Sequence, residues 1–289
     1  MASMMHRRAF LKQSALAGAA ITISGGMSVG EEKPQALPTI RLGTVEVSRL
    51  VFGSNPFYGF AHKMGKLGEE MKAYYTDERI TAALDEAASH GITAVASPVY
   101  ERWVKLLAQY RERGGKLPIW IAQPDGPPDH MEKEIAAAVK GGAKAVFVQG
   151  GRVDEQVGKG DWERLRKWVD LIRSLGVPAG LASHRPDVHL EAEKRKLPTD
   201  FYFQCFYNPG HEEYTPEDRE AAIAAIKQIE KPVVGYKILA AGRLKGREGF
   251  EFAFRHIRRK DGVCVGMFPK NQPTQIAENA ALTRELTLG

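Results

Sequence analysis

Short apolar runs alternate with stretches of helical periodicity from residue 40 onward. In the helical stretches, apolar residues recur at spacings of three and four, as at Trp162, Leu165 and Trp168, which is typical of a helix with one buried face. Strands that alternate with helices form a parallel sheet covered by helices. Eight such units therefore predict an α/β fold, a (β/α)8 TIM barrel. The runs that predict its strands are 50–55, 92–98, 118–124, 143–151, 179–184, 201–208, 232–239 and 262–268.

Polar residues mark the start of two of the helices. Thr215 precedes Pro216 and two acids. In such a sequence the hydroxyl caps the helix, proline occupies the first turn, and negative charge meets the positive end of the helix dipole. Thr76 precedes Asp77 and Glu78 in the same way. We therefore expect helices to begin directly after Thr76 and Thr215.

The first thirty residues differ from the rest of the chain. Arg7 and Arg8 stand before Phe-Leu-Lys and an Ala-rich apolar run without an acid, an order that resembles a twin-arginine export signal. It predicts a signal segment at 1–30, a linker at 31–38 and a barrel at 39–289, with export by the twin-arginine machinery to the periplasm or another extracytoplasmic site. An amphipathic start to the domain is the alternative. No run reaches membrane-spanning length, so we expect no span in the mature protein.

Composition favours one globular domain of ordinary charge. The chain has 289 residues, 43% of them hydrophobic, enough for one substantial core. Its net charge of +6 comes from 41 bases and 35 acids; without residues 1–30, which hold three bases and no acid, 38 − 35 leaves +3. No basic stripe interleaved with aromatics indicates nucleic-acid binding. Cys205 and Cys264 both fall in predicted strands, so we expect no disulfide framework.

Several segments, in order, carry a resemblance to a known family. The tail GVCVGMFPKNQPTQIAENAAL at 262–282, the opening TIRLGTVEVSRLVFGSNPF at 39–57 and GYKILAAGR at 235–243 are the longest of them. Together they resemble the aldo/keto reductase superfamily over residues 39–285. The resemblance implies a TIM barrel whose floor is closed by a short N-terminal hairpin, and a functional face formed by the loops after the strands. It also implies NADP as cofactor.

The same resemblance implies roles for single residues. Ser183 and Gln204 correspond to contacts of the nicotinamide carboxamide, and Tyr236 to the residue that stacks on its ring. Lys270 corresponds to a partner of the 2′-phosphate. Gln275, Glu278 and Asn279 lie on the helix that holds the adenosine end. For the strand residues the alternative is packing inside the barrel, and for the helix residues it is a solvated outer face.

The catalytic residues of the family are largely missing. Its members use a Tyr, a Lys, an Asp and a His, and here Ala96, Gln123 and Gln149 stand at the Asp, Lys and His positions. Only Tyr100 remains, and a phenol has a pKa near 10 without a neighbouring cation to lower it. The uncharged mouth suits hydroxyl-rich small molecules. The predicted substrate-binding residues are Asn55, Gln123, Gln149, Tyr207 and Asn208.

Two other residues are candidates for acid/base or nucleophilic work. His184 ends a strand at the barrel mouth, and its reference pKa is close to physiological pH; a loop histidine bonded to backbone is the alternative. Lys237 is a candidate base or Schiff-base nucleophile, or else an anion anchor. The other titratable residues on this face are His211, Glu212, Glu213, Asp125 and Asp154. A metal site of His184, His211 and Glu212 is not enforced by spacing, and we predict none.

Three functions stay open at this stage. The first is an exported NADP-linked oxidoreductase that acts on a small carbonyl or sugar-like substrate through a non-standard proton donor. The second is a non-redox lyase, isomerase or aldolase-like enzyme that uses His184 and Lys237. The third is a binding barrel without turnover. The fold alone does not choose among them.

Overall fold

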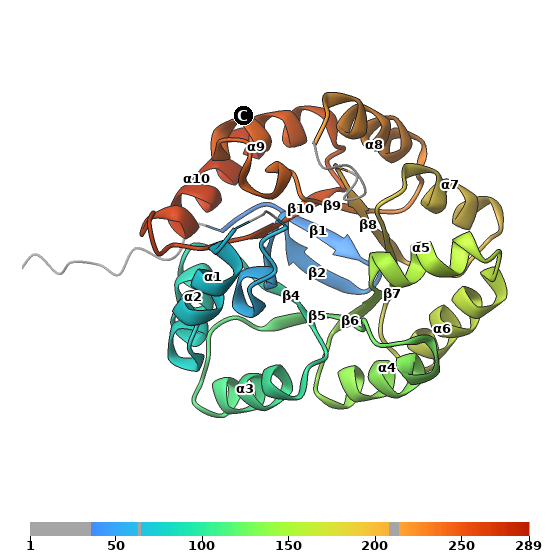
Figure 1. Ribbon diagram of the computed structural model, residues 1–289, viewed down its shortest axis with the longest axis horizontal. Coiled ribbons are helices and arrows are strands. Elements are labelled where there is room, and N and C mark those ends of the chain that lie inside the picture. Colours follow the sequence, from blue (N-terminus) through green and yellow to red (C-terminus); the bar gives the residue numbers. More distant parts are fainter. Residues whose placement is uncertain (1–35, 63–64, 208–213, 289) are drawn as a thin grey trace, which may run out of the picture. The chain divides into compact units, whose positions relative to one another are not determined.

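A closed barrel of eight parallel strands forms the centre of the molecule (Figure 1). The computed structural model describes residues 36–62, 65–207 and 214–288. The predicted signal and most of the predicted linker lie outside these ranges. The predicted TIM barrel is confirmed. Its strands, in the order in which they pair around the barrel, are β10 (Gly262–Gly266), β3 (Leu50–Gly53), β4 (Ala94–Pro98), β5 (Ile119–Gln123), β6 (Ala145–Val148), β7 (Ala179–Ser183), β8 (Phe201–Cys205) and β9 (Val233–Tyr236).

Each strand lies inside a predicted run but ends before it does or starts after it. The largest differences are at the ends that carry the site. Gln149 to Gly151 turn into a helix instead of extending β6, and Lys237 leaves β9 in a left-handed conformation with φ 57°. Ile238, beyond β9, is still buried, at 2% exposed. Burial of a loop side chain therefore made the strand look longer in the sequence than it is.

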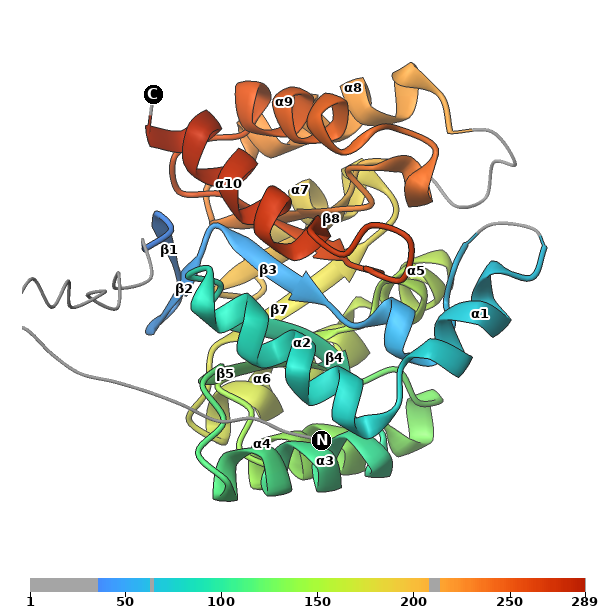
Figure 2. The same ribbon diagram turned by 90° about the vertical axis from the view of Figure 1, so that its left-hand side faces the viewer.

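A short antiparallel hairpin precedes the barrel, as the family resemblance implied. It consists of β1 (Thr39–Leu42) and β2 (Val45–Ser48), and Ile40, Leu42 and Val47 join the hydrophobic cluster inside the barrel. Figure 2 shows it at the end of the barrel where the strands begin. Gly43 makes the turn at φ 61°, and a Cβ there would lie 2.9 Å from Pro178 Cβ. The hairpin thus closes the floor and leaves the opposite end as the mouth.

Helices surround the barrel (Figure 1). Thr76 Oγ1 accepts from Arg79 N at 3.3 Å, as expected for the cap, whereas Thr215 occupies the capping position without a side-chain hydrogen bond. No helix of the described residues is long and apolar enough to cross a membrane. The helices are α1 (Leu67–Tyr74), α2 (Asp77–Ser89), α3 (Glu101–Glu112), α4 (Met131–Lys140), α5 (Gly150–Gly158), α6 (Trp162–Ser174), α7 (Pro186–Lys194), α8 (Pro216–Gln228), α9 (Gly246–His256) and α10 (Gln275–Leu288), with short 3-10 turns at Asn55–Tyr58, Pro128–His130 and Ala240–Gly242.

The core has two layers, as expected for strands whose side chains alternate between the barrel interior and the helices. The outer layer contains Trp103, Trp120 and Trp168, all at most 2% exposed. In the inner layer Phe147 and Phe203 stack with ring centroids 4.0 Å apart. This pair fills the barrel directly below its mouth.

Candidate active site

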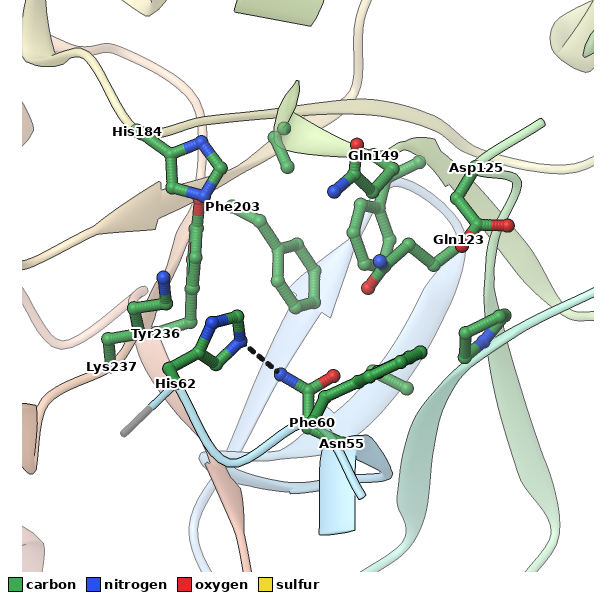
Figure 3. Close-up of a pocket in the computed structure, with 15 residues that line it drawn as sticks. Asn55, Phe60, His62, Gln123, Asp125, Gln149, His184, Phe203, Tyr236 and Lys237 are labelled. Carbon is green, nitrogen blue, oxygen red and sulfur yellow. Dashed lines mark hydrogen bonds between the residues drawn. The ribbon is translucent and has the colours of Figure 1, made fainter. Parts of the chain in front are cut away.

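A cavity of about 250 Å³ opens at the carboxyl ends of the strands, above the stacked rings of Phe147 and Phe203 (Figure 3). The side chains that the sequence placed at strand ends converge on it, because parallel strands of one barrel end at the same face. Its further lining residues are Asn55, Phe60, His62, Ala96, Pro98, Gln123, Asp125, Gln149, Gly150, Ala182, His184, Tyr236 and Lys237.

His184 is the imidazole of this cavity, and Asp154 of α5 holds it. Asp154 Oδ2 lies 2.8 Å from His184 Nδ1 and accepts from the His184 backbone N at 3.2 Å. Ser183 Oγ donates to the other carboxylate oxygen at 2.5 Å. The carboxylate accepts the proton of Nδ1 and so fixes the tautomer of the neutral ring, which leaves Nε2 as the atom that can exchange a proton. This pairing makes His184 an oriented acid/base group.

The start of α5 packs closely against this pair. Gln149 caps the helix, because its Oε1 accepts from Arg152 N at 3.0 Å. Gly150 follows, and a Cβ there would lie 3.0 Å from Tyr236 Oη and 3.1 Å from His184 Cε1. Only glycine leaves both rings in place. The first turns of α5 therefore bring the Gln149 amide, the Gly150 backbone and the Asp154 carboxylate close to His184.

Tyr236 presents a ring next to His184. The two ring centroids are 5.8 Å apart, and Tyr236 Oη donates to the Ser183 carbonyl oxygen at 3.1 Å. Burial raises the pKa of Tyr236 well above its usual value. The phenol is therefore neutral, and the residue offers a surface for stacking instead of an acid.

Tyr100 is not at the cavity in the way that the sequence suggested. Its hydroxyl donates to Asp125 Oδ2 at 2.6 Å, and Asp125, not Tyr100, lines the cavity. Burial, followed by the bond to Asp125, raises the pKa of Tyr100. Burial also raises the pKa of Asp125. The predicted proton donor thus serves as a partner for a carboxyl group on the wall across from His184 (Figure 3).

His62 and Lys237 also line the cavity, and both have unusual surroundings. His62 Nε2 lies 3.2 Å from Asn55 Nδ2, and burial, with Lys237 second, lowers the pKa of His62 to about 4. A neutral His62 accepts from the amide. Lys237 Nζ is buried and has no hydrogen-bond partner among the described residues, and burial lowers its pKa. Nothing in the periodicity of the chain marks His62, which lies on a loop beyond β3, and the sequence did not identify it.

A groove leads from this cavity towards α10. A second cavity of about 280 Å³ shares Asn55, Phe60, His62, Tyr236 and Lys237 with the first. A third, of about 710 Å³, shares Leu239, Gly242 and Gln275 with the second. Through these shared residues the three cavities follow one another from His184 to α10.

The helix residues predicted to hold a cofactor gather at the far end of this groove. Gln275 lines the second and third cavities, and its Oε1 accepts from Phe268 N at 2.5 Å. Glu278 accepts from Gln272 and Thr274, each at 2.5 Å. Asn279 is 4% exposed, and its Nδ2 has no partner in the described part of the chain. A buried amide without a partner is an available donor or a cost in free energy.

Other predicted residues lie away from the groove. Ser183 and Gln204 are fully buried and line none of the three cavities; Gln204 Nε2 donates to the Cys205 carbonyl oxygen at 2.9 Å. Lys270 forms an ion pair with Glu70 at 3.1 Å. Tyr207 is buried against Tyr214, with ring centroids 5.4 Å apart, so its side chain does not reach the substrate cavity.

The remaining predictions fall on residues that the structure does not describe. Asn208, a predicted substrate contact, is one of these, as are His211, Glu212 and Glu213. Across the described ranges, no group of three His, Cys, Asp or Glu side chains is placed to hold a metal ion.

Comparison with solved structures agrees with the architecture. Two structures from Pseudomonas aeruginosa, each described as a "putative aldo-keto reductase", match with 17% sequence identity. The first has a TM-score of 0.61 and covers 87% of this chain and 98% of its own; the second has 0.59, 88% and 96%. The barrel resembles that of the aldo/keto reductases. No protein-family model and no curated protein sequence matches the chain.

An archaeal ribulose-1,5-bisphosphate carboxylase/oxygenase also matches, with a TM-score of 0.50, 13% identity, and coverage of 75% of this chain and 57% of that one. Because an enzyme with so different a reaction has a similar barrel, the fold alone does not indicate which reaction this protein catalyses. The aldo/keto reductase-like fold therefore places the strand ends, and the residues at those ends have to supply the argument for function.

Proposed function

We propose that the protein is an NADP-linked oxidoreductase that interconverts a small carbonyl compound and its alcohol, with His184 as proton donor in place of the family's tyrosine. The observation that carries the proposal is the position of His184, held by Asp154, beside the ring of Tyr236 at the inner end of the groove that reaches α10. A proton donor, a stacking surface and a path for a dinucleotide are thereby adjacent.

The residues fit NADP at the ring and at the adenosine end. Tyr236 offers a neutral aromatic face that lines both inner cavities, and Asn279 offers a buried amide without a described partner. Bound NADPH would supply a hydride to the substrate carbon. The predicted contacts with the nicotinamide carboxamide fit less well than those at the ring and the adenosine end. Ser183 is already hydrogen-bonded to Asp154, and Gln204 to the Cys205 carbonyl oxygen. Lys270 would have to leave Glu70 to meet a 2′-phosphate.

The protein's own residues then control the proton. In the direction of reduction, protonated His184 donates from Nε2 to the substrate oxygen while Asp154 holds Nδ1. In the direction of oxidation, neutral His184 takes the hydroxyl proton back. The amides of Asn55, Gln123 and Gln149 hydrogen-bond to further hydroxyl groups of the substrate. The rings of Phe147 and Phe203 exclude water from below.

Binding and turnover test this proposal separately. NADPH fluorescence should change when the cofactor is mixed with the full chain, and Asn279→Ala should weaken binding roughly tenfold, the equivalent of one hydrogen bond. His184→Ala should leave binding intact and lower turnover by about a hundredfold or more. No fluorescence change at millimolar NADPH would remove the cofactor from the proposal, and full turnover by His184→Ala would remove the proton donor.

A second candidate function is favoured by the opposite wall. Asp125, bonded to Tyr100, faces the cavity across from His184 (Figure 3). Two proton-holding groups on facing walls suit an isomerase, in which one group removes a proton next to a carbonyl and the other returns it. Such an enzyme would exchange that proton for deuterium in D2O without any cofactor. A substrate recovered without the label would reject this alternative.

The location of the protein is a separate proposal. We propose that residues 1–30 direct the folded barrel through the twin-arginine machinery, on the strength of Arg7, Arg8 and the acid-free apolar run that follows. A small-molecule substrate would then be met outside the cytoplasm.

A further inference from the structure

Lys237 has an amine for which the described part of the chain offers no hydrogen-bond partner. Its Nζ is buried and has no hydrogen-bond partner among those residues. The two carboxylates nearest the first cavity are bonded elsewhere, Asp125 to Tyr100 and Asp154 to His184. Because a buried amine without a partner costs free energy, an anionic ligand that bonds to it would be bound favourably.

The neighbours of Lys237 do not supply a negative charge. Burial raises the pKa of the Cys205 thiol to about 12, so this group is neutral. His62 is neutral as well, since burial lowers its pKa to about 4. Arg243, which interacts with Lys237 electrostatically, is a second cation; it donates to the carbonyl oxygens of His62 and Ala240. None of these three neighbours is therefore an anion that could pair with the amine.

The backbone places Lys237 at the border between two cavities. Lys237 has φ 57°, and Ala240 and Ala241 that follow have φ 48° and 54°. Left-handed conformations are unfavourable for residues with a Cβ. Three such residues between positions 237 and 241 persist only where the surrounding structure enforces their conformation. As a result the side chain of Lys237 borders both the first and the second cavity.

We propose that Lys237 binds the carboxylate of the substrate, so that the substrate is a carbonyl compound that also bears a carboxylate group. A charge-assisted hydrogen bond from Nζ would hold the carboxylate, while His184 acts at the carbonyl oxygen and the amides of Gln123 and Gln149 bind hydroxyl groups. The inference rests on the proposed function only in taking a carbonyl compound as the ligand. A cofactor phosphate is the other source of an oxyanion, because the amine also borders the second cavity.

Pyruvate and hydroxyacetone are matched probes, because they differ only in a carboxylate against a hydroxymethyl group. Each is titrated calorimetrically into the full-length protein, with and without saturating NADP+, which cannot reduce the probe. We expect pyruvate to bind at least tenfold more tightly than hydroxyacetone, and Lys237→Met to weaken pyruvate roughly tenfold to a hundredfold, the loss of a charged hydrogen bond, with hydroxyacetone unchanged.

Lys231→Met is the control. It makes the same change in a half-buried lysine that precedes β9 and donates to the Leu197 carbonyl oxygen and Thr199 Oγ1, away from the cavity. It should keep the preference for pyruvate. Equal binding of the two probes, or a preference that survives Lys237→Met, overturns the inference.

The same experiment separates the two sources of an oxyanion. If Lys237→Met weakens NADP+ binding and leaves pyruvate unaffected, the amine belongs to a cofactor phosphate and the inference is wrong. If NADP+ does not bind but the preference for pyruvate depends on Lys237, the redox function fails while the carboxylate site stands. Each failure thus has its own signature.

Discussion

At the scale of single residues, the site depends on pairings between side chains that are far apart in the chain. His184 is separated from Asp154 by 30 residues, and Tyr100 from Asp125 by 25. The chemistry of each member follows from its partner. A histidine backed by a carboxylate is an oriented base, whereas a tyrosine bonded to a buried carboxyl group is a poor acid.

Asp154→Asn tests the first pairing. The amide has the same shape but favours the wrong tautomer of His184. We expect kcat to fall between roughly a hundredfold and ten-thousandfold, with a smaller change in KM. Steady-state kinetics across pH would show it. A kcat within about twofold of the parent protein would mean that Asp154 does not orient the donor.

His189 of α7 predicts a pH dependence of stability. It is fully buried, its Nε2 lies 3.0 Å from the Phe203 carbonyl oxygen, and burial lowers its pKa to about 4. In the unfolded chain a histidine titrates near pH 6.5. Between these values the unfolded state binds more protons, so stability is complete above about pH 6.5 and is lost as the pH falls towards 4, by about 3 kcal/mol in total.

Denaturant unfolding at pH 7 and pH 5 measures this loss. In His189→Gln the part of the pH dependence due to this residue should disappear, even if the variant is less stable at both pH values. An unchanged difference in unfolding free energy between the two pH values would show that His189 is not the group responsible.

At the scale of the elements, α5 is the helix that assembles one wall of the candidate active site. Its first residues provide the Gln149 cap, the Gly150 contact and Asp154. A prediction from sequence assigned Gln149 to Gly151 to the preceding strand, because apolar residues lead directly into them. Gln149 is an unusual cap, so no strong local signal marked this helix start.

Gly150→Ala tests the close packing of α5. The new Cβ would press on Tyr236 Oη and His184 Cε1, at 3.0 and 3.1 Å. We expect a loss of about 1–3 kcal/mol in unfolding free energy together with reduced turnover. Gly158→Ala is the control in the same helix, since its Cβ would meet nothing within 4 Å; it should be neutral or stabilising by up to about 1 kcal/mol. Equal effects of the two changes would contradict the packing argument.

At the scale of the whole molecule, a barrel closed by its own hairpin carries an open groove on the other end. The groove joins residues of β3, β9 and α10 through the adjoining cavities. A scaffold closed at one end and open at the other lets the mouth change its chemistry without loss of the core. The family resemblance implies that Gln123 and Gln149 replace charged catalytic residues, and such freedom would allow that replacement.

Export belongs to this scale too. With a reporter fused after the full-length chain, Arg7→Lys together with Arg8→Lys should abolish export of the folded fusion, because the receptor reads the arginine pair. Fractionation of cells and measurement of reporter activity outside the cytoplasm check this. Arg41→Lys in the full-length protein is the control, since Arg41 lies in β1 of the barrel. Unimpaired export of the double variant would contradict the signal.

The sequence by itself determined the barrel, because alternation of apolar runs and helical faces is a local property that each unit repeats. It also determined which residues stand at strand ends, and so His184, Gln123, Gln149 and Tyr236 were found at one cavity. Tertiary structure alone decided that Asp154 backs His184, that Asp125 takes the hydroxyl of Tyr100, and that Lys237 has no described partner. These depend on side-chain direction and burial across distant segments, and on turns of one or two residues, which no periodic pattern encodes.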